Sequence, residues 1–380
     1  MTNPKEELAK LRERLDKVTA DLTLAFNERQ RISSEIAVVK ANGNIAITDD
    51  AREQFVVDSS VALADADNKA NTVTFVRGLI ALSKIRQNEK LGLLNALEFA
   101  PPRARIDGKI AYQGIAGAWS EQAAHTLFPD SELTEREYFA DVFDAVLDGG
   151  AAYGVVPLEN SRAGAVGDVY DLLRRNAVYI VGQVWLDITQ CLVGISGTQL
   201  SEVREVFSHE QGLSQCNRFL RNKNWELTAV SNTAVAAKMV ADKDNRKLAA
   251  IASRRAAELF GLEVLAPDIA DDKGNKTRFI VIAKNPEYDE HSDTVTVTFS
   301  TNHYSGALVS VLQAFMLAGI NLKRIESRPG AVPNNYRFFV DMEDANILNP
   351  STRDALIQAA MQCEYFEILG CYSTAEQNKI

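Results

Sequence analysis

The run NKTRF, from Asn275 to Phe279, places a threonine and an arginine between a polar turn and the apolar run FIVIA. The apolar run predicts a strand, so Thr277 and Arg278 should lie where a loop enters a sheet, which is a common place for catalytic side chains. A threonine hydroxyl is a weak acid but can serve as a positioned hydrogen-bond donor. Taken alone, the same run is also typical of an ordinary turn.

A second group of polar residues lies in the first 90 positions. Arg29 and Lys40 are 11 residues apart in a predicted helix, about three turns plus 20°, so both project from one face about 16 Å apart. Two cations at this spacing could bracket a small dianion. The run DDARE predicts the start of a second helix, and SxxxQ predicts one face of a third. The polar residues of these two runs are Asp49, Arg52 and Glu53, then Ser83 and Gln87.

Two proline-containing segments divide the chain into three differently patterned units. The segments are FAPPRARIDGK, near residue 100, and KNPEYDEHSD, near residue 290. The predicted domains are residues 1–98, 106–285 and 294–375. The first opens with a helix over residues 5–40, with apolar residues at three- and four-residue spacing. Such a helix is too long for a monomeric domain of this size, so we expect it to pair with a second chain in a homodimer or higher homo-oligomer.

The second unit alternates strands and helices, while the third is a compact α+β unit. Four strand-to-helix junctions in the second unit carry small or hydrogen-bonding residues. Because helix N-termini present free N–H groups, several converging junctions could bind a compound with two carboxylates. Gly114 and Gly117 do not form a dinucleotide fingerprint, because the third glycine and the acidic ribose partner are missing. We therefore expect no NAD.

Composition limits the partners of this chain of 380 residues, which is 46% hydrophobic. A net charge of −10 argues against a nucleic-acid partner. The sequence has no signal-peptide pattern and no apolar stretch of bilayer length, so we expect a cytoplasmic protein with no membrane partner. Four cysteines without metal-ligand spacing predict free thiols, no metal and no cofactor.

The polar residues of the first unit, as an ordered set with Arg12, resemble the all-helical chorismate mutase family. The Claisen rearrangement of chorismate needs no nucleophile or metal, only a held conformer and stabilised negative charge on the breaking ether oxygen. The resemblance implies that Arg12 and Arg29 bind the carboxylates, and that Lys40 and Gln87 donate to the ether oxygen. It also implies that Glu53 with Asp49 accepts the substrate hydroxyl, and that Arg52 and Ser83 bind substrate.

The second unit, through YQGIAGAWSEQAA, PLENSRAGAVGDVYDLL, SHEQGLSQC, AAIASRRAAELFGL and NKTRF, resembles the prephenate dehydratase family. This resemblance implies a two-lobed α/β fold similar to periplasmic binding proteins, with Thr277 catalytic and Arg278 meeting a substrate carboxylate. The other residues implied to bind substrate are Glu159, Asn160, Ser161, Ser208, Gln211, Gln215 and Phe279. Departures from the family pattern at Arg162, Ala163 and Asn232 leave prephenate and arogenate both open as substrates.

The third unit predicts the order strand, helix, strand, strand, helix, strand, which is the ferredoxin-like arrangement. With the motifs GALV and ESRP it resembles the ACT regulatory domain, which implies phenylalanine binding. The implied effector residues are Gly306, Ala307, Leu308 and Val309, followed by Glu326, Ser327, Arg328 and Pro329. A purely structural dimerisation module is the alternative.

Together the three resemblances imply a bifunctional chorismate mutase and prephenate dehydratase of phenylalanine biosynthesis. Such an enzyme converts chorismate to prephenate and prephenate to phenylpyruvate, under feedback inhibition by L-phenylalanine. Two alternatives are open: a prephenate or arogenate dehydratase with a non-catalytic helical domain, and a non-catalytic amino-acid sensor. The intact NKTRF run argues against the sensor, and the mutase residue set argues against a non-catalytic helical domain.

Overall fold

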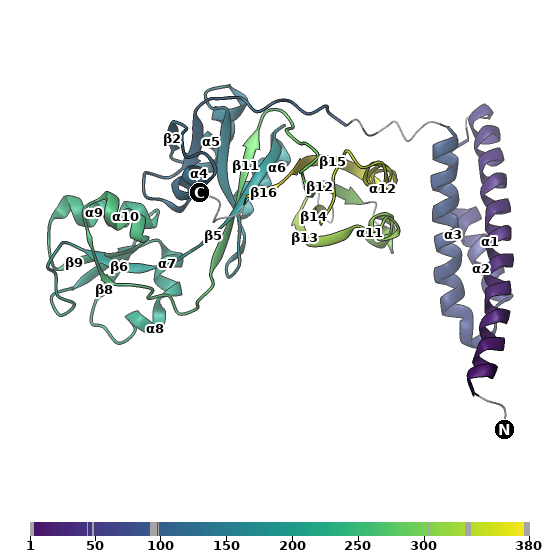
Figure 1. Ribbon diagram of the computed structural model, residues 1–380, viewed down its shortest axis with the longest axis horizontal. Coiled ribbons are helices and arrows are strands. Elements are labelled where there is room, and N and C mark those ends of the chain that lie inside the picture. Colours follow the sequence, from purple (N-terminus) through teal and green to yellow (C-terminus); the bar gives the residue numbers. More distant parts are fainter. Residues whose placement is uncertain are drawn as a thin grey trace.

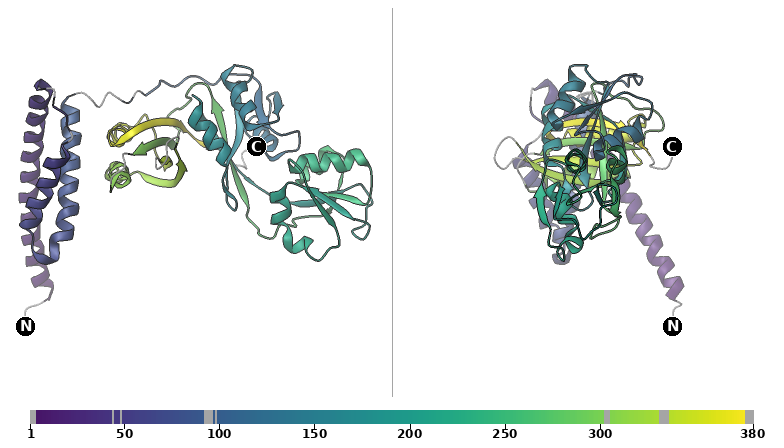
Figure 2. Two further views of the ribbon diagram at one scale, coloured as in Figure 1. Left: turned by 180° about the vertical axis from the view of Figure 1, so that it is seen from behind. Right: turned by 90° about the vertical axis from the view of Figure 1, so that its left-hand side faces the viewer.

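The computed structural model describes residues 4–43, 45–47, 49–91, 97, 99–301, 305–330 and 336–375. The first part, here the helical unit, consists of helices α1 (Pro4–Asn42), α2 (Asp50–Ala62) and α3 (Lys69–Lys90), with a short 3-10 turn at Ala66–Asn68. Helices α1 and α3 run side by side along most of the length of α3 (Figures 1 and 2). The predicted long first helix is confirmed, and the Asp49 side chain caps α2 by accepting from the Arg52 amide at 3.0 Å.

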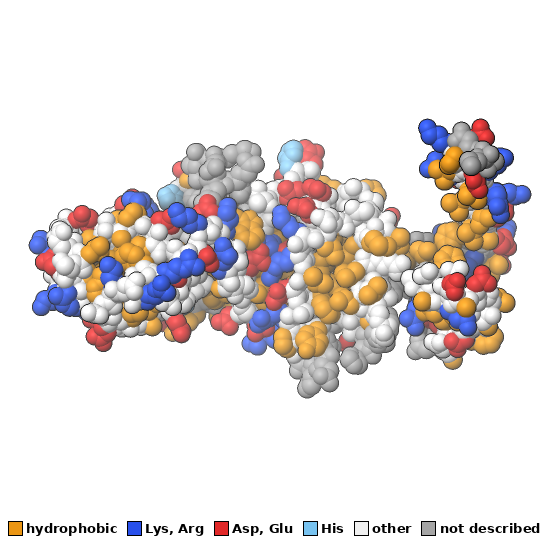
Figure 3. All heavy atoms as spheres, turned by 90° about the horizontal axis from the view of Figure 1, so that it is seen from below, with side chains coloured by type: hydrophobic (Ala, Val, Ile, Leu, Met, Phe, Trp, Pro, Cys, Tyr) orange, Lys and Arg blue, Asp and Glu red, His pale blue; other side chains and the backbone are white. Residues whose placement is uncertain are grey.

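Helix α1 buries little of its apolar surface within this chain. Leu11, Leu15 and Leu22 are 53%, 64% and 54% exposed, and hydrophobic side chains line the helical unit at the right of the space-filling view (Figure 3). Of the residues described in α1, only Ser33 and Ala37 are buried. Helices in proteins gain most of their stability by packing an apolar face. Among the described residues nothing covers the leucines on the N-terminal half of α1, so this face is open to a partner.

The first lobe is built on a seven-stranded sheet in the order β16-β5-β11-β3-β1-β2, with β4 paired to β3. Its helices are α4 (Trp119–Leu127), α5 (Phe139–Leu147) and α6 (Gly167–Arg175). Strand β3 is parallel to β1, whereas β11 runs antiparallel to both β3 and β5. The strands are β1 (Ile110–Gln113), β2 (Leu133–Arg136), β3 (Tyr153–Asn160), β4 (Gly164–Ala165), β5 (Tyr179–Asp187), β11 (Lys276–Ala283) and β16 (Thr374–Ala375).

The second lobe has a five-stranded sheet in the order β10-β6-β9-β7-β8. Its strands are β6 (Cys191–Gly194), β7 (Glu205–Ser208), β8 (Glu226–Ala229), β9 (Leu248–Ala252) and β10 (Glu263–Ala266). Its helices are α7 (Glu210–Gln215), α8 (Asn217–Leu220), α9 (Thr233–Lys243) and α10 (Arg254–Leu259). The chain crosses between the lobes twice, after β5 and before β11 (Figure 1). The predicted alternation of strands and helices is confirmed. The two segments that cross between the lobes are hydrogen-bonded to each other close to Thr277, from the Ile188 amide to the Asn275 carbonyl.

The third unit has the predicted order, with a four-stranded antiparallel sheet β13-β14-β12-β15. The elements are β12 (Thr294–Thr301), α11 (Ala307–Leu317), β13 (Asn321–Pro329), β14 (Tyr336–Glu343), α12 (Pro350–Ala360) and β15 (Cys363–Tyr372). This order and sheet topology are the ferredoxin-like arrangement.

The third unit shares a hydrophobic core with the first lobe. Phe339, Leu369 and Tyr372 belong to the same buried cluster as Tyr170 and Ile180. The Tyr170 and Phe339 rings meet edge to face at 4.8 Å, and β16 adds a parallel strand to the first sheet beside β5. The third unit is therefore packed onto the first lobe through apolar side chains as well as through the connecting segment. No helix in the described residues combines the length and apolar character needed to cross a membrane.

Candidate active sites

Thr277 and Asn160 lie opposite each other on neighbouring strands of the first lobe, close to the two crossings. Both side chains are largely buried. The Asn160 amide nitrogen Nδ2 lies 2.8 Å from Thr277 Oγ1 and 2.7 Å from Asn275 Oδ1. The expected position of Thr277 at the entry of a strand is confirmed by the start of β11 at Lys276.

The orientation of the Asn160 amide is fixed by the backbone of the following turn. Its oxygen Oδ1 accepts hydrogen bonds from the amides of Arg162 at 3.0 Å and Ala163 at 2.9 Å, so its nitrogen must be the end that faces Thr277. Since that nitrogen can only donate, Thr277 Oγ1 accepts from Asn160. The hydroxyl proton of Thr277 is then available to a bound ligand.

A short chain of amides connects this pair to the second lobe. Asn275 Nδ2 donates to Gln215 Oε1 at 3.3 Å, and Gln190 Nε2 donates to the same oxygen at 3.4 Å. Gln215 ends helix α7, and Gln190 lies in the first crossing. The sequence predicted Gln215 but missed the roles of Asn275 and Gln190. Asn275 could have been found from its place in NKTRF, whereas no sequence signal marks Gln190.

The predicted contact of Arg278 with a substrate carboxylate is corrected by the structure. Its guanidinium is buried and forms an ion pair with Asp341 of the third unit. Glu159, also expected at the substrate, is paired with Arg324, Nε to Oε2 at 2.5 Å. The reason is strand geometry: successive side chains of a strand point to opposite faces, so Arg278 and Glu159 face away from Thr277 and Asn160.

The remaining predicted dehydratase residues fall into two groups. Ser161 lies near the crossings, where its Oγ accepts from the Lys276 amide at 2.9 Å. Gln211 lies half-buried in α7 on the facing second lobe. Phe279 and Ser208 are buried instead: Phe279 is in the first-lobe core, and Ser208 donates to the Ile251 carbonyl at 2.9 Å. Neither buried side chain is placed to contact a ligand in this conformation, because packing and the hydrogen bond already occupy them.

The helical unit brings several predicted mutase residues together. Arg29 on α1 donates to Ser83 Oγ and to the Leu79 carbonyl on α3, the latter at 2.5 Å, and burial lowers the pKa of its guanidinium below the ordinary value. Lys40 Nζ donates to the Ile47 carbonyl at 2.6 Å. The Gln87 side chain is buried, and its Oε1 has no hydrogen-bond partner among the residues described. An unpaired buried amide oxygen is costly, so Gln87 Oε1 is suited to accept a hydrogen bond from a ligand.

Glu53 has a neighbour that the sequence reading missed. Lys84 Nζ lies 3.1 Å from a Glu53 carboxylate oxygen, and Lys84 immediately follows Ser83 on α3. Its position beside the predicted polar face of that helix was the available signal. Arg52 stacks on the Phe55 ring at 5.0 Å, and Arg12 is exposed on the N-terminal half of α1.

The motifs expected to bind an effector lie at one end of the third unit. Gly306 precedes α11 with φ of 90°, a left-handed conformation that glycine adopts without strain. Ala307 is buried, Leu308 is partly buried and Val309 is exposed. Glu326, Ser327, Arg328 and Pro329 form the end of β13, an edge strand. The Arg328 guanidinium lies against Gly167 of the first lobe, where a Cβ atom would approach Nη2 to 2.5 Å.

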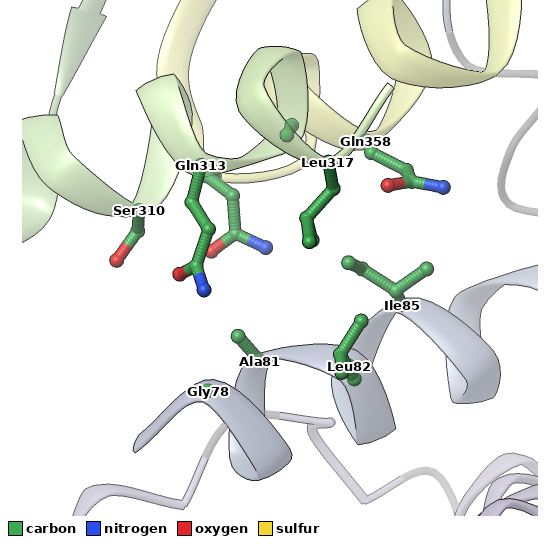
Figure 4. Close-up of a pocket in the computed structure, with 10 residues that line it drawn as sticks. Gly78, Ala81, Leu82, Ile85, Ser310, Gln313, Leu317 and Gln358 are labelled. Carbon is green, nitrogen blue, oxygen red and sulfur yellow. The ribbon is translucent and has the colours of Figure 1, made fainter. Parts of the chain in front are cut away.

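A separate pocket lies between α3 and the helices of the third unit (Figure 4). Ala81, Leu82 and Ile85 of α3 face Gln313 and Leu317 of α11 across it, with Gln358 at one side. None of the predicted mutase, dehydratase or effector residues lines this pocket.

Comparisons with known proteins match two family models and relatives that cover up to nearly the full chain. The family model for prephenate dehydratase matches residues 110–287, and that for chorismate mutase type II matches residues 11–88. The chain is 30% identical over 381 aligned residues to a bifunctional chorismate mutase/prephenate dehydratase of Enterobacter agglomerans, covering 97% of each chain. It is 36% identical to arogenate dehydratase/prephenate dehydratase 2 of Arabidopsis thaliana over 70% of this chain and 72% of that protein.

Among solved structures, the chain is similar to the prephenate dehydratase from Arthrobacter aurescens in complex with L-Phe. The TM-score is 0.64 with 28% identity, over 70% of this chain and 89% of that chain.

Proposed function

Because the chain belongs to the family of bifunctional chorismate mutase/prephenate dehydratases, we propose that its two reactions take place at the two groups of residues described above. The mutase reaction is assigned to the site around Arg29 and Gln87, and the dehydratase reaction to the site around Thr277. The observation that carries the second assignment is the fixed hydrogen bond from Asn160 to Thr277.

The mutase site needs cations and hydrogen-bond donors in a fixed arrangement. Arg29 is assigned to a carboxylate of chorismate, and Lys40 and Gln87 to the ether oxygen on which negative charge develops. Glu53, with Asp49 beside it, is assigned to the substrate hydroxyl. The ion pair of Glu53 with Lys84 orients this carboxylate.

The dehydratase reaction expels hydroxide and carbon dioxide and gains an aromatic ring. The site needs a proton donor for the leaving hydroxyl and groups that hold the carboxylates. Thr277 supplies the donor, since its oxygen already accepts from Asn160. The Gln215 amide nitrogen and the N-terminus of α4, which has no side-chain cap, are the proposed carboxylate ligands in place of Arg278.

Thr277→Ala tests this assignment with an internal control. The variant should lose dehydratase activity by roughly 10²–10³, the usual effect of removing one preorganised donor, while its mutase activity stays at the wild-type level. Thr277→Ser, which keeps the hydroxyl, should retain much of the dehydratase activity. Full phenylpyruvate production by the alanine variant would remove Thr277 from the mechanism.

The third unit is proposed to be an ACT regulatory domain that binds L-phenylalanine. Its ferredoxin-like topology and the left-handed Gly306 at the start of α11 support this assignment, as does the relative whose structure is described with L-Phe. The effector would bias the equilibrium between arrangements of the lobes by binding one of them more tightly.

The protein is proposed to act as a dimer joined through α1. The exposed leucines of α1 need a partner, and an antiparallel second α1 would cover them. Such a pairing would also bring Arg12 of one chain to the Arg29 and Lys40 site of the other. The plant relatives named for both arogenate and prephenate keep arogenate as an alternative substrate of the second site.

A further inference from the structure

The two strands that carry the dehydratase site present ionic side chains on their opposite face. Thr277 and Asn160 are register partners between β11 and β3, and so are the next pair, Arg278 and Glu159. Because the side chains of a strand alternate, the site lies on one face and the two charged groups on the other. Both charged groups end in ion pairs with the third unit.

The Arg278 pair is buried and surrounded by hydroxyl groups. The side chains of Arg278 and Asp341 are 4% and 5% exposed. Arg278 Nη2 donates to the Tyr372 hydroxyl at 2.9 Å, and the Thr296 hydroxyl donates to Asp341 Oδ1 at 2.6 Å. Asp341, Tyr372 and Thr296 come from three strands of the third unit, β14, β15 and β12, so the guanidinium is held by the sheet as a whole.

Charge on this pair persists across the usual assay range. Burial alone raises the pKa of the Asp341 carboxyl, but the Arg278 charge and the hydrogen bonds from Arg278 and Thr296 outweigh it, so the pKa lies below the ordinary value. Burial raises the pKa of Tyr372 to about 12, which leaves its hydroxyl neutral. The network is therefore permanently ionic at Arg278 and Asp341.

The second pair lies beside the first. Glu159 binds Arg324, whose guanidinium also stacks on the Tyr170 ring at 5.0 Å. The register between β3 and β11 shifts by one residue immediately after this pair: Arg278 lies opposite Glu159, but Phe279 lies opposite Pro157. Bulges of this kind redirect nearby side chains. The two ion pairs hold Arg278 and Glu159 in place at the bulge. Through the strand backbone they therefore also set the direction of the Thr277 and Asn160 side chains.

We propose that Asp341 and Arg324 of the third unit are positioning residues of the dehydratase site, acting through Arg278 and Glu159 on Thr277 and Asn160. The inference rests on the proposed role of Thr277. A shift of the third unit's sheet relative to the first lobe moves the two ion pairs, and through the strand backbone it moves the hydroxyl that donates to the substrate. The contrasting role is simple adhesion between the two parts, which would affect stability alone.

The first experiment replaces Asp341 by asparagine in the full-length protein, keeping shape while removing charge. The dehydratase kcat should fall roughly 10- to 100-fold, as expected when a catalytic group is displaced by about 1 Å. Mutase activity, measured in the same preparation, should stay at the wild-type level, and KM for prephenate should change by less than about threefold, since these residues do not touch substrate. Wild-type dehydratase kcat in a variant of normal mutase activity would overturn the proposal.

Thr374→Val is the matched control. Its hydroxyl accepts from Gln183 at 2.6 Å in the contact between β16 and β5, so it belongs to the same contact between third unit and first lobe but lies outside the ion pairs. The control should lower Tm without lowering the dehydratase kcat. If Thr374→Val lowers kcat as much as Asp341→Asn at an equal loss of Tm, the ion pairs have no specific role.

The double variant Arg278→Met with Asp341→Leu covers the case in which a single variant folds poorly, because removing both charges avoids an unpaired buried ion. Its Tm should exceed that of Asp341→Leu, while its dehydratase kcat should remain low. Recovery of kcat together with Tm would overturn the proposal. If Thr277→Ala is fully active, the underlying assignment of the site fails; if Thr277→Ala is inactive and Asp341→Asn has normal kcat, only the present inference fails.

Discussion

Asn160 determines whether the Thr277 hydroxyl donates or accepts toward a ligand. Its amide oxygen accepts from two backbone N–H groups, so its nitrogen donates to Thr277 Oγ1 and leaves the hydroxyl proton for the ligand. The sequence predicted both residues as members of one site. It could not predict the partners of Arg278 and Glu159. Strand alternation turns these two side chains to the opposite face, but what covers that face depends on how the third unit packs.

Asn160→Asp should lower dehydratase kcat by roughly 10²–10³ while leaving the mutase reaction unchanged. A carboxylate in this position accepts the Thr277 hydroxyl proton and withdraws it from the substrate. The change is measured by phenylpyruvate formation from prephenate. Asn176→Asp, at the end of α6 and away from both sites, is the control. A kcat within about threefold of wild type would mean that Asn160 does not set the direction of the hydroxyl.

Lys40→Ala should lower mutase turnover by roughly 10²–10³, because one donor to the developing negative charge is lost. The structure holds Lys40 at the C-terminal end of α1 through the Ile47 carbonyl. Lys69→Ala, an exposed lysine at the start of α3, should leave the rate unchanged. Equal rates for the two variants would assign the ether oxygen to another donor.

The elements themselves were largely predictable, since apolar spacing marks α1 and strand-like runs mark β3, β11 and β12. The end of α1 near Gly43 and the cap at Asp49 follow from local signals. The shared core of the first lobe and third unit was not predictable. The proline-containing segment near residue 290 suggested a separate unit, whereas Leu369 and Tyr372 complete the core of the first lobe. That packing links residues far apart in the chain.

Gly370→Ala should destabilise the full-length protein by about 1–3 kcal/mol, the usual cost of overpacking. A Cβ atom at this position would approach the Ile180 carbonyl oxygen to 2.0 Å, so β15 and β5 must separate. Thermal unfolding followed by circular dichroism measures the loss. Gly182→Ala is the control: it lies on the facing strand β5, and its Cβ atom would have its nearest neighbour 3.4 Å away. Identical Tm values for the two variants would contradict the close approach of β15 to β5.

Each chain carries residues of both proposed active sites. If α1 pairs with α1 of a second chain, the mutase site is formed by residues of both chains. Arg12 and Arg29 are 17 residues apart, about 25 Å along the helix and about 260° around it, so one chain cannot grip a small ligand with both. An antiparallel pair of α1 helices removes this obstacle and covers the exposed leucines as well.

Complementation tests the shared site. Arg12→Ala and Arg29→Ala proteins should each lack mutase activity, and unfolding and refolding them together in equal amounts should restore roughly a quarter of the wild-type activity. Half of the dimers are then mixed, and each mixed dimer has one site with both arginines. If mixed dimers form but stay as inactive as the two parent proteins, Arg12 and Arg29 of different chains do not share one site.

The central claim, that one chain carries both reactions in sequence, is tested by incubating the purified wild-type protein with chorismate alone and following products by chromatography. The account predicts that chorismate is consumed, prephenate rises and falls, and phenylpyruvate accumulates without added metal or cofactor. Chorismate that remains unchanged would contradict the mutase assignment. Prephenate that accumulates without phenylpyruvate would contradict the dehydratase assignment.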